Sequence, residues 1–227
     1  IQLKRRKEVK REYHLFFTHF HWDHLQGLPF FTPLFDPDVT VHFYSEDERF
    51  EEYVRGQMRY PYFPVTLDIM ASQLEFHTLT GSFCNISGAR IGWRKMKHPG
   101  GSRSYAVTEN GHKLIFSTDT ELSSEHDFER TEENIAYFKN ADVMIMDSQY
   151  TLGEAIEKYD WGHSSYSLAV DFAAEWNVKN LVLFHHEPLY DDQKMYNILK
   201  SASWYLNHLE QTGTRIYLAR EGLEFEL

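Results

Sequence analysis

The chain contains very little cysteine and no long apolar segment. Among its 227 residues Cys84 is the single cysteine, which excludes a disulfide within one chain and favours a reducing cytoplasm. No apolar run reaches the length that crosses a bilayer, and no signal-peptide pattern is present. We therefore expect a cytoplasmic protein without a membrane partner.

Positive charge is also scarce, because the chain carries a formal net charge of −11. Affinity for long nucleic acids comes largely from neutralising their phosphates, so this balance argues against such a partner. The exception is the basic segment 3–11, LKRRKEVKR, which we interpret as solvated chain. Hydrophobic residues make up 42% and charged residues 25%, which is ordinary globular composition, and we expect one domain over residues 1–227.

Short segments rich in β-branched and aromatic residues alternate with amphipathic stretches. The pattern predicts strands over 13–18, 40–45, 73–79, 90–97, 103–108, 113–118, 142–147, 180–185, 214–218 and 223–227. It predicts helices over 23–32, 47–58, 130–139, 164–177 and 191–210. This alternation indicates an α/β protein of packed layers. Residues 46–72, charged at first and then aromatic with two prolines, are interpreted as a flap or a structural crossover.

The segment HFHWDH, residues 19–24, gathers three histidines and an aspartate at the end of an apolar strand. Residues two apart in an extended segment point the same way, so His19, His21 and Asp23 share one face, and His24 turns in as the chain bends. Buried polar groups without partners are costly, whereas a metal ion would satisfy such side chains together. Because imidazole and carboxylate ligands suit zinc, manganese and iron, the segment predicts a metal site.

Four further residues of the same kinds stand at the ends of other predicted elements. His98, Asp119 and His185 end or directly follow predicted strands, and His163 precedes a predicted helix. In open α/β sheets, binding sites gather outside the carboxyl ends of the strands. We therefore expect these residues at the same site as the 19–24 segment.

The motifs of this chain resemble those of the metallo-β-lactamase superfamily. HFHWDH matches the HxHxDH signature of that superfamily, and its later motifs are matched in order by HPGGS, STDTE, DSQY, WGHSS and LFHHEP. Within the superfamily, these motif sequences are similar to those of the ribonuclease Z and phosphonate-pathway cyclic phosphodiesterase branches. The resemblance covers about residues 13–192 and implies an αββα sandwich with a dinuclear metal centre.

The resemblance also implies a role for each matching residue. His19, His21 and His98 would hold one divalent ion, Asp23, His24 and His185 would hold a second, and Asp119 would bridge both. Zinc is favoured, with manganese or iron left open, and such a pair lowers the pKa of a shared water. Asp23 and His163 are assigned to catalysis, because His163 corresponds to a histidine that binds no metal and faces the scissile phosphate.

Other residues near the motifs are expected to contact the substrate or to orient the ligands. The expected substrate contacts are Gly100, Gly101, Ser102 and Ser164, and the expected orienting residues are His186, Glu187 and Asp191. The glycines equally fit a plain turn, as do Glu187 and Asp191 around Pro188. Tyr60, Tyr62 and Phe63 fit stacking on a base, although core packing is favoured.

The N-terminal end of the chain departs from the superfamily pattern. Superfamily members carry strands ahead of the HxHxDH motif, and here only a short segment precedes it. The predicted sandwich therefore lacks its usual N-terminal strands, which leaves a sheet edge to be covered. We expect either a homo-oligomer or an association with an N-terminal segment outside this chain.

The leading interpretation is a metal-dependent hydrolase of a small phosphodiester, such as a cyclic nucleotide, a cyclic phosphate or a short oligonucleotide. Ribonuclease Z reaches its RNA with a long basic, glycine-rich arm, which this sequence does not show, so transfer-RNA precursors are disfavoured. Two alternatives stay open: hydrolysis of another ester, a lactone or an amide, and a diiron protein that binds oxygen or transfers electrons. His21 argues against the diiron alternative, because flavodiiron relatives place glutamate there.

Overall fold

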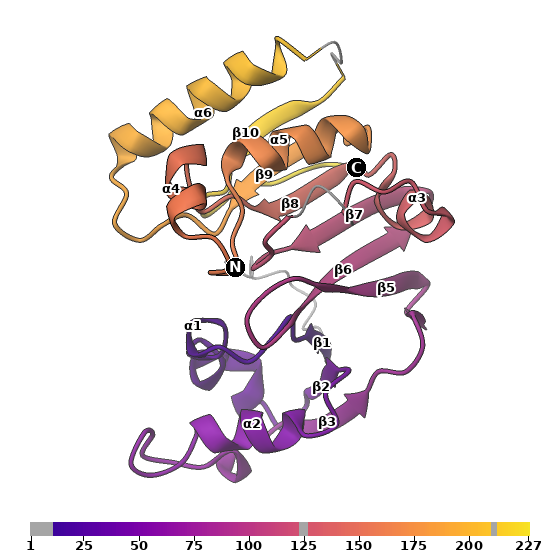
Figure 1. The fold of residues 1–227 in the computed structure, drawn as a ribbon. Helices are drawn as coiled ribbons and strands as arrows, with labels where there is room; N and C mark the ends of the chain where they lie inside the picture. The colour runs from indigo at the N-terminus through magenta and orange to yellow at the C-terminus, as the bar shows by residue number, and fades with distance from the viewer. Residues whose placement is uncertain (1–10, 123–126, 210–212) are drawn as a thin grey trace. The chain divides into compact units, whose positions relative to one another are not determined.

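The computed structural model describes residues 11–122, 127–209 and 213–227, so most of the basic segment 3–11 lies outside the described residues (Figure 1). The described chain forms two compact units, residues 11–81 and residues 82–227, which we call the N-terminal and the C-terminal unit. Each unit has its own sheet, and both combine strands with helices. The predicted α/β class is therefore confirmed, whereas the single domain stays a prediction.

The N-terminal unit is built on a parallel sheet of three strands in the order β1-β2-β3. The strands are β1 (Glu12–Phe16), β2 (Thr40–Ser45) and β3 (Gln73–Thr78). Alternate residues of the strands, including the fully buried Val41 and Phe43, pack against Phe50 and Val54 of helix α2 (Phe50–Gln57). One face of this sheet is therefore covered by the core of the unit.

The helix predicted over 23–32 is wrong. The structure has a short helix α1 (Trp22–Leu25), followed by two 3-10 turns, η1 (Leu28–Phe30) and η2 (Thr32–Phe35); a third, η3 (Leu67–Ile69), precedes β3. Pro29 and Pro33 stand near the starts of η1 and η2. A proline lacks the N–H that a continuing α-helix needs, so the segment breaks into single turns.

The C-terminal unit is built on a mixed sheet of seven strands in the order β10-β9-β8-β7-β6-β5-β4. The strands are β4 (Phe83–Ile86), β5 (Ala89–Met96), β6 (Ser102–Glu109), β7 (His112–Ser117), β8 (Val143–Asp147), β9 (Asn180–Phe184) and β10 (Arg215–Leu218). Neighbours from β4 to β7 run antiparallel, and neighbours from β7 to β10 run parallel. Parallel strands end at a common edge of the sheet, so the residues that follow them lie close together there.

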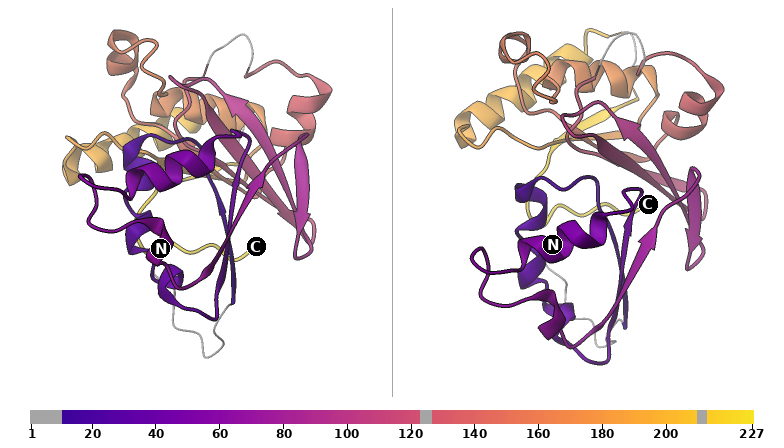
Figure 2. Two further views of the ribbon diagram at one scale, coloured as in Figure 1. Left: turned by 90° about the horizontal axis from the view of Figure 1, so that it is seen from below. Right: turned by 60° about the horizontal axis from the view of Figure 1, so that its bottom comes forward.

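Four helices belong to the described part of the C-terminal unit, and two of them pack against the parallel strands of its sheet. The four are α3 (Glu132–Phe138), α4 (Leu152–Glu157), α5 (Tyr166–Glu175) and α6 (Asp192–Leu206). Helices α5 and α6 lie side by side, α5 against β8 and β9 and α6 against β10 (Figure 2). Their apolar residues join those of the sheet in one core that includes Phe172 and Trp176. Across the described helices, none is long and apolar enough to cross a membrane.

Three elements of the C-terminal unit differ from the sequence prediction. The strand β4 was not predicted; it pairs with β5 through a tight turn in which Ser87 and Gly88 have φ angles of 50° and 90°. Helix α4 was not predicted either, because its six residues are too few to show a helical period. Residues 223–227 form no strand, so that prediction is wrong.

A carboxylate network fixes helix α4. Glu154 accepts hydrogen bonds from the backbone N–H of Thr151 at 3.0 Å and from Lys194 Nζ at 2.7 Å, and also from the hydroxyl of Tyr190. Burial raises the pKa of this carboxyl, but the hydrogen bonds from Lys194, Thr151 and Tyr190 outweigh it and lower the pKa to about 2. The folded state therefore stabilises the ionised form of Glu154.

We expect Glu154→Gln to lower the free energy of unfolding by about 1 kcal/mol at neutral pH, because it weakens charge-assisted hydrogen bonds. A lowered folded-state pKa stabilises the fold above the unfolded pKa of 4.5, and this contribution is lost as the pH falls from there towards 2. The difference in unfolding free energy between wild type and variant should therefore narrow as the pH falls below 4.5. Urea unfolding curves of the metal-free wild type and variant at pH 7 and pH 3 measure this difference. Glu157→Gln, which alters an exposed residue of α4, is the control. A gap that is equal at both pH values would contradict the assignment.

Candidate active site

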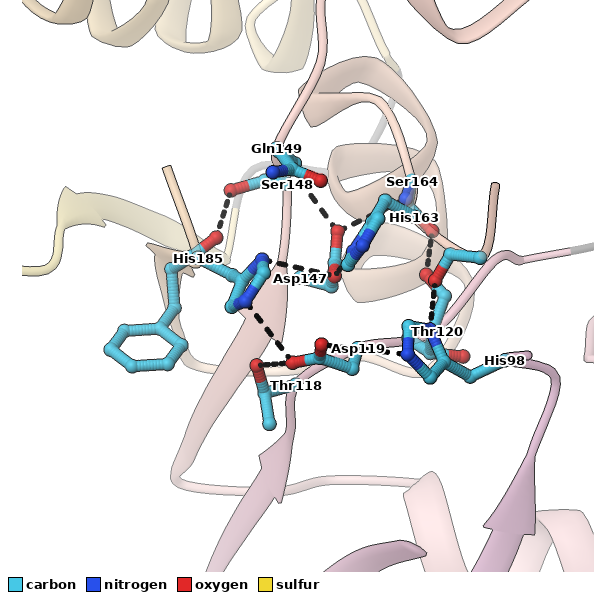
Figure 3. Close-up of polar contacts among 12 residues, drawn as sticks. His98, Thr118, Asp119, Thr120, Asp147, Ser148, Gln149, His163, Ser164 and His185 are labelled. Atoms are coloured by element: carbon cyan, nitrogen blue, oxygen red, sulfur yellow. Dashed lines mark hydrogen bonds and ion pairs between the residues drawn. The ribbon is translucent and has the colours of Figure 1, made fainter. Parts of the chain in front are cut away.

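Polar side chains meet at the edge of the C-terminal sheet where the parallel strands β7, β8 and β9 end. Asp119 follows β7 by two residues, Asp147 is the last residue of β8, and His185 directly follows β9. Because the strands are parallel neighbours, their ends bring these residues together (Figure 3). Asp119 and His185 thus lie together at one edge of the sheet, where the strand-end argument from the sequence expects them.

Asp119 lies between two imidazoles. One carboxylate oxygen, Oδ1, is 3.3 Å from His185 Nε2, and the other, Oδ2, is 3.7 Å from His98 Nε2. Thr118 Oγ1 donates a hydrogen bond to Oδ1 at 2.6 Å, which helps to orient the carboxylate (Figure 3). Each oxygen of Asp119 therefore faces a different histidine, as a carboxylate that bridges two metal ions would.

The backbone is left-handed at two of these residues. Asp119 has a φ of 49° and His185 a φ of 59°. Residues with a side chain avoid this region, and such conformations gather at functional sites. For His185 the conformation ends β9 abruptly and turns its ring towards Asp119.

The fully buried carboxylate of Asp147 holds His163, a partnership that the sequence reasoning missed. His163 Nδ1 donates a hydrogen bond to Asp147 Oδ2 at 2.7 Å, and the backbone N–H of Ser164 donates to Oδ1 at 3.0 Å (Figure 3). His185 Nδ1 lies 3.9 Å from the same Oδ2. With Nδ1 held by the carboxylate, Nε2 of His163 is the atom that can exchange a proton with a substrate. Asp147 belongs to the matched motif DSQY, and the strand-end rule applied to Asp119 would also have found it.

His98 is oriented by a loop that Glu121 secures. His98 Nδ1 donates to the carbonyl of Gly162 at 2.9 Å, which turns its Nε2 towards Asp119. The N–H of Gly162 donates to Glu121 Oε2 at 2.9 Å, and Lys97 Nζ donates to the other carboxylate oxygen at 2.8 Å. A ligand histidine whose second nitrogen donates to a carbonyl is the usual arrangement around metals.

Other predicted site residues of this unit have structural contacts. Gly100 and Gly101 form a turn with positive φ angles, in which the N–H of Gly101 donates to the carbonyl of His98. The hydroxyls of Ser102 and Ser164 are buried and donate to the carbonyls of Thr118 and Thr120. Both hydroxyls therefore make hydrogen bonds within the protein beside the site.

The three residues expected to orient an imidazole bind other partners. His186 Nε2 donates to the carbonyl of Ala219 at 3.4 Å, and burial lowers the pKa of this histidine. Glu187 pairs with Lys158 at 3.4 Å. Asp191 accepts a hydrogen bond from the N–H of Lys194 and so caps helix α6. Within residues 127–209, none of the contacts found for Glu187 or Asp191 reaches a site histidine.

In the N-terminal unit, the four predicted ligands of the 19–24 segment lie together around α1. His19 Nε2 is 3.1 Å from His21 Nδ1, and the His19 and His24 rings lie 4.3 Å apart between centroids. His24 Nε2 is 3.3 Å from Asp23 Oδ2. The segment therefore folds into a compact set of nitrogen and oxygen donors.

An aromatic hollow of about 670 Å³ adjoins this segment within the N-terminal unit. It is lined by Trp22, Gln26, Pro29, Phe30, Gly56, Gln57, Tyr62 and Phe63. Trp22 and Tyr62 are 72% and 77% exposed, and Tyr60 is 90% exposed, so the core packing favoured for the two tyrosines is wrong. Phe63 does pack against the core.

The donor chemistry of both units fits divalent metal ions. Ligand atoms of Asp119, His163 and His185 lie within 4.8 Å of one another in the C-terminal unit. Carboxylate and imidazole donors at this spacing suit zinc, manganese or iron. The carboxyl ends of parallel strands are also where open α/β sheets place their binding sites, so this cluster is a candidate metal centre.

The chain belongs to the beta-lactamase superfamily, whose domain model matches residues 2–186. The fold of this superfamily implies binding of divalent metal. A relative named Ribonuclease Z from Picrophilus torridus is 32% identical over 119 residues, which is 52% of this chain and 32% of that protein. The chain thus spans about a third of the length of this relative.

Solved structures share the fold. The metallo-beta-lactamase fold protein YhfI from Bacillus subtilis superimposes with a TM-score of 0.65 at 17% identity, over 92% of this chain and 75% of that one. A diphosphatase from the PhnP family superimposes with a TM-score of 0.62 at 20% identity, over 96% and 73%. The resemblance to the metallo-β-lactamase superfamily inferred from the motifs is therefore confirmed.

Proposed function

We propose that this chain is a metal-dependent phosphodiesterase that cleaves a small phosphodiester with a dinuclear centre. The observation that carries the proposal is the pairing of His163 with Asp147 beside the carboxylate of Asp119. Metal ligands alone would serve any hydrolase of the superfamily. A histidine held by a buried carboxylate adds a group suited to protonating a departing alkoxide oxygen.

The proposed ligands follow the assignment from the sequence. His19, His21 and His98 would hold one ion, Asp23, His24 and His185 would hold the other, and Asp119 would be shared between them. The placement of each Asp119 oxygen towards a different histidine supports the bridging role. When bound, two such ions lower the pKa of a water and neutralise charge on the phosphate.

The residues of the chain itself position and transfer protons. Asp147 keeps the Nδ1 proton of His163 in place and stabilises the imidazolium form, since a nearby carboxylate favours the charged ring. His163 Nε2 then gives a proton to the oxygen that leaves phosphorus. Asp23, next to His24, is proposed to assist the attacking water in addition to binding metal.

The aromatic hollow of the N-terminal unit supports a substrate that carries a base. Trp22 immediately precedes Asp23, and Trp22, Phe30 and Tyr62 present large exposed ring faces. Stacking on aromatic side chains contributes about 1–3 kcal/mol per base. Cyclic nucleotides and short oligonucleotides are therefore favoured, and the relatives named Ribonuclease Z and diphosphatase are consistent with phosphate chemistry.

Substrate screening of the metal-loaded chain tests the proposal. We expect turnover of bis(p-nitrophenyl) phosphate and of a cyclic nucleotide with zinc, manganese or iron, and much slower turnover of a lactone and a thioester. Removing the metal with a chelator should abolish activity, and adding it back should restore it. Absence of phosphodiester hydrolysis with all three metals would refute the proposal.

A further inference from the structure

The sheet of the N-terminal unit carries a row of histidines on the face opposite its core. On β2, Phe43 is fully buried, and its neighbour His42 therefore lies on the other face of the strand. The parallel register places His42 opposite His14 of β1 and opposite Glu75 of β3. His77 lies two residues beyond Glu75 and thus on the same face.

Three donor atoms of this row form a tight triangle. His42 Nδ1 is 3.0 Å from His77 Nε2 and 3.1 Å from Glu75 Oε2. His77 Nε2 is 3.5 Å from the same oxygen. Tetrahedral zinc with bonds of about 2.0–2.1 Å separates its nitrogen and oxygen ligands by roughly 3.3–3.4 Å. The triangle therefore matches one face of a zinc coordination tetrahedron.

Hydrogen bonds alone satisfy these atoms poorly. His42 Nδ1 carries at most one proton, so it would have to share that proton between His77 Nε2 and Glu75 Oε2. If both rings direct an N–H at Glu75, two donors face each other at 3.0 Å. A divalent cation removes this conflict, because two neutral imidazoles and a carboxylate then all donate electron pairs to it.

We propose that His42, Glu75 and His77 bind a zinc-type divalent ion that ties β2 to β3. None of these residues belongs to the seven predicted ligands, and the proposal does not depend on the phosphodiesterase activity. The side chains of Glu75 and His77 are 37% and 39% exposed, so an ion reaches them from solvent. With three protein ligands, the fourth tetrahedral position is left to water.

The neighbouring strand supports the proposed site. The His14 ring stacks on His42 at 4.7 Å between centroids, and its Nδ1 lies 3.0 Å from the hydroxyl of Tyr44. Ligand atoms of Glu12, His14 and His42 also lie within 4.8 Å of one another. These contacts hold the His42 ring in place and add negative charge beside the ion.

Counting zinc on the metal-free chain tests the site. The chain is titrated with zinc chloride, followed by native mass spectrometry and calorimetry, for wild type, His77→Gln and Glu75→Gln. We expect each variant to bind one zinc fewer than wild type, or to bind that ion at least tenfold more weakly, while phosphodiester turnover is unchanged. Zinc should also raise the melting temperature less in the variants, because an ion bound only by the folded state stabilises it.

The control is His112→Gln, which alters an exposed histidine lying 3.8 Å from Asp142 without a second imidazole in that pair. It should bind as much zinc as wild type. If His77→Gln lacks the native circular dichroism spectrum, Glu75→Gln decides, since it keeps the size of the side chain. Wild-type zinc stoichiometry and affinity in Glu75→Gln would overturn the proposal, whether or not the protein proves to be a phosphodiesterase.

Discussion

Gly162→Ala is expected to lower phosphodiester turnover by roughly 10²-fold or more, because misplacing a reacting group by about 1 Å has that effect. Gly162 has a φ of +92°, and a Cβ there would lie 2.3 Å from Pro99 Cδ and 2.4 Å from His98 Nδ1. Neither distance is tolerable, so His98 must move and lose its hydrogen bond to the carbonyl of residue 162. The ion proposed at His98 should therefore bind more weakly. Turnover and metal content of the purified variant measure both effects.

Gly222→Ala is the matched control for this prediction. Gly222 also has a positive φ, +80°, but a Cβ there meets nothing within 4 Å. The control therefore carries the backbone strain, about 1–3 kcal/mol, without the collision. It should lose some stability and keep its turnover and metal. If Gly162→Ala keeps wild-type turnover and metal content, the orienting role of the loop is wrong.

His163→Ala is expected to lower turnover by about 10²–10⁴-fold, the usual contribution of a general acid, and to leave the metal content unchanged. Asp147→Asn should cause most of the same loss. An asparagine amide that donates to His163 Nδ1 leaves the ring neutral with its single proton on Nε2, and a neutral imidazole gives up that proton far less readily than an imidazolium held by a carboxylate.

A double variant that combines Asp147→Asn with His163→Ala tests whether the two residues act together or independently. If Asp147 acts through His163, the double variant should be no slower than His163→Ala alone. Asp147 also accepts the N–H of Ser164, and asparagine retains an oxygen for that bond, so the fold should persist. Loss of one metal ion from His163→Ala would instead show that this residue is a ligand, as its grouping with Asp119 and His185 permits.

The sequence predicts the parallel half of the C-terminal sheet well because its strands are continuous apolar runs. VMIMD and NLVLF are buried on both faces and are bounded by polar residues, so the ends of these strands can be identified from the sequence. The order of the strands in the sheet then determines where the residues that follow them lie. For this reason the sequence alone places His185, which follows NLVLF, at the same edge of the sheet as Asp119, which follows the predicted strand 113–118.

The residues that orient the ligands could not be predicted in the same way. Gly162 matters because it touches His98, 64 positions earlier, and Glu121 matters because it accepts the N–H of Gly162. Such roles depend on contacts between distant loops, which leave no period in the sequence. The same holds for His42, Glu75 and His77, which alternate with core residues and look like ordinary strand positions until the register is known.

The left-handed backbone at Asp119 and His185 implies a compromise between activity and stability. For residues with a side chain this conformation costs roughly 1–2 kcal/mol per residue, and glycine would adopt it more easily. A chain selected for stability alone would place glycine at both positions, since nothing in strand packing requires an aspartate or a histidine there. If both residues bind metal as proposed, replacing either with glycine should stabilise the metal-free protein and abolish activity.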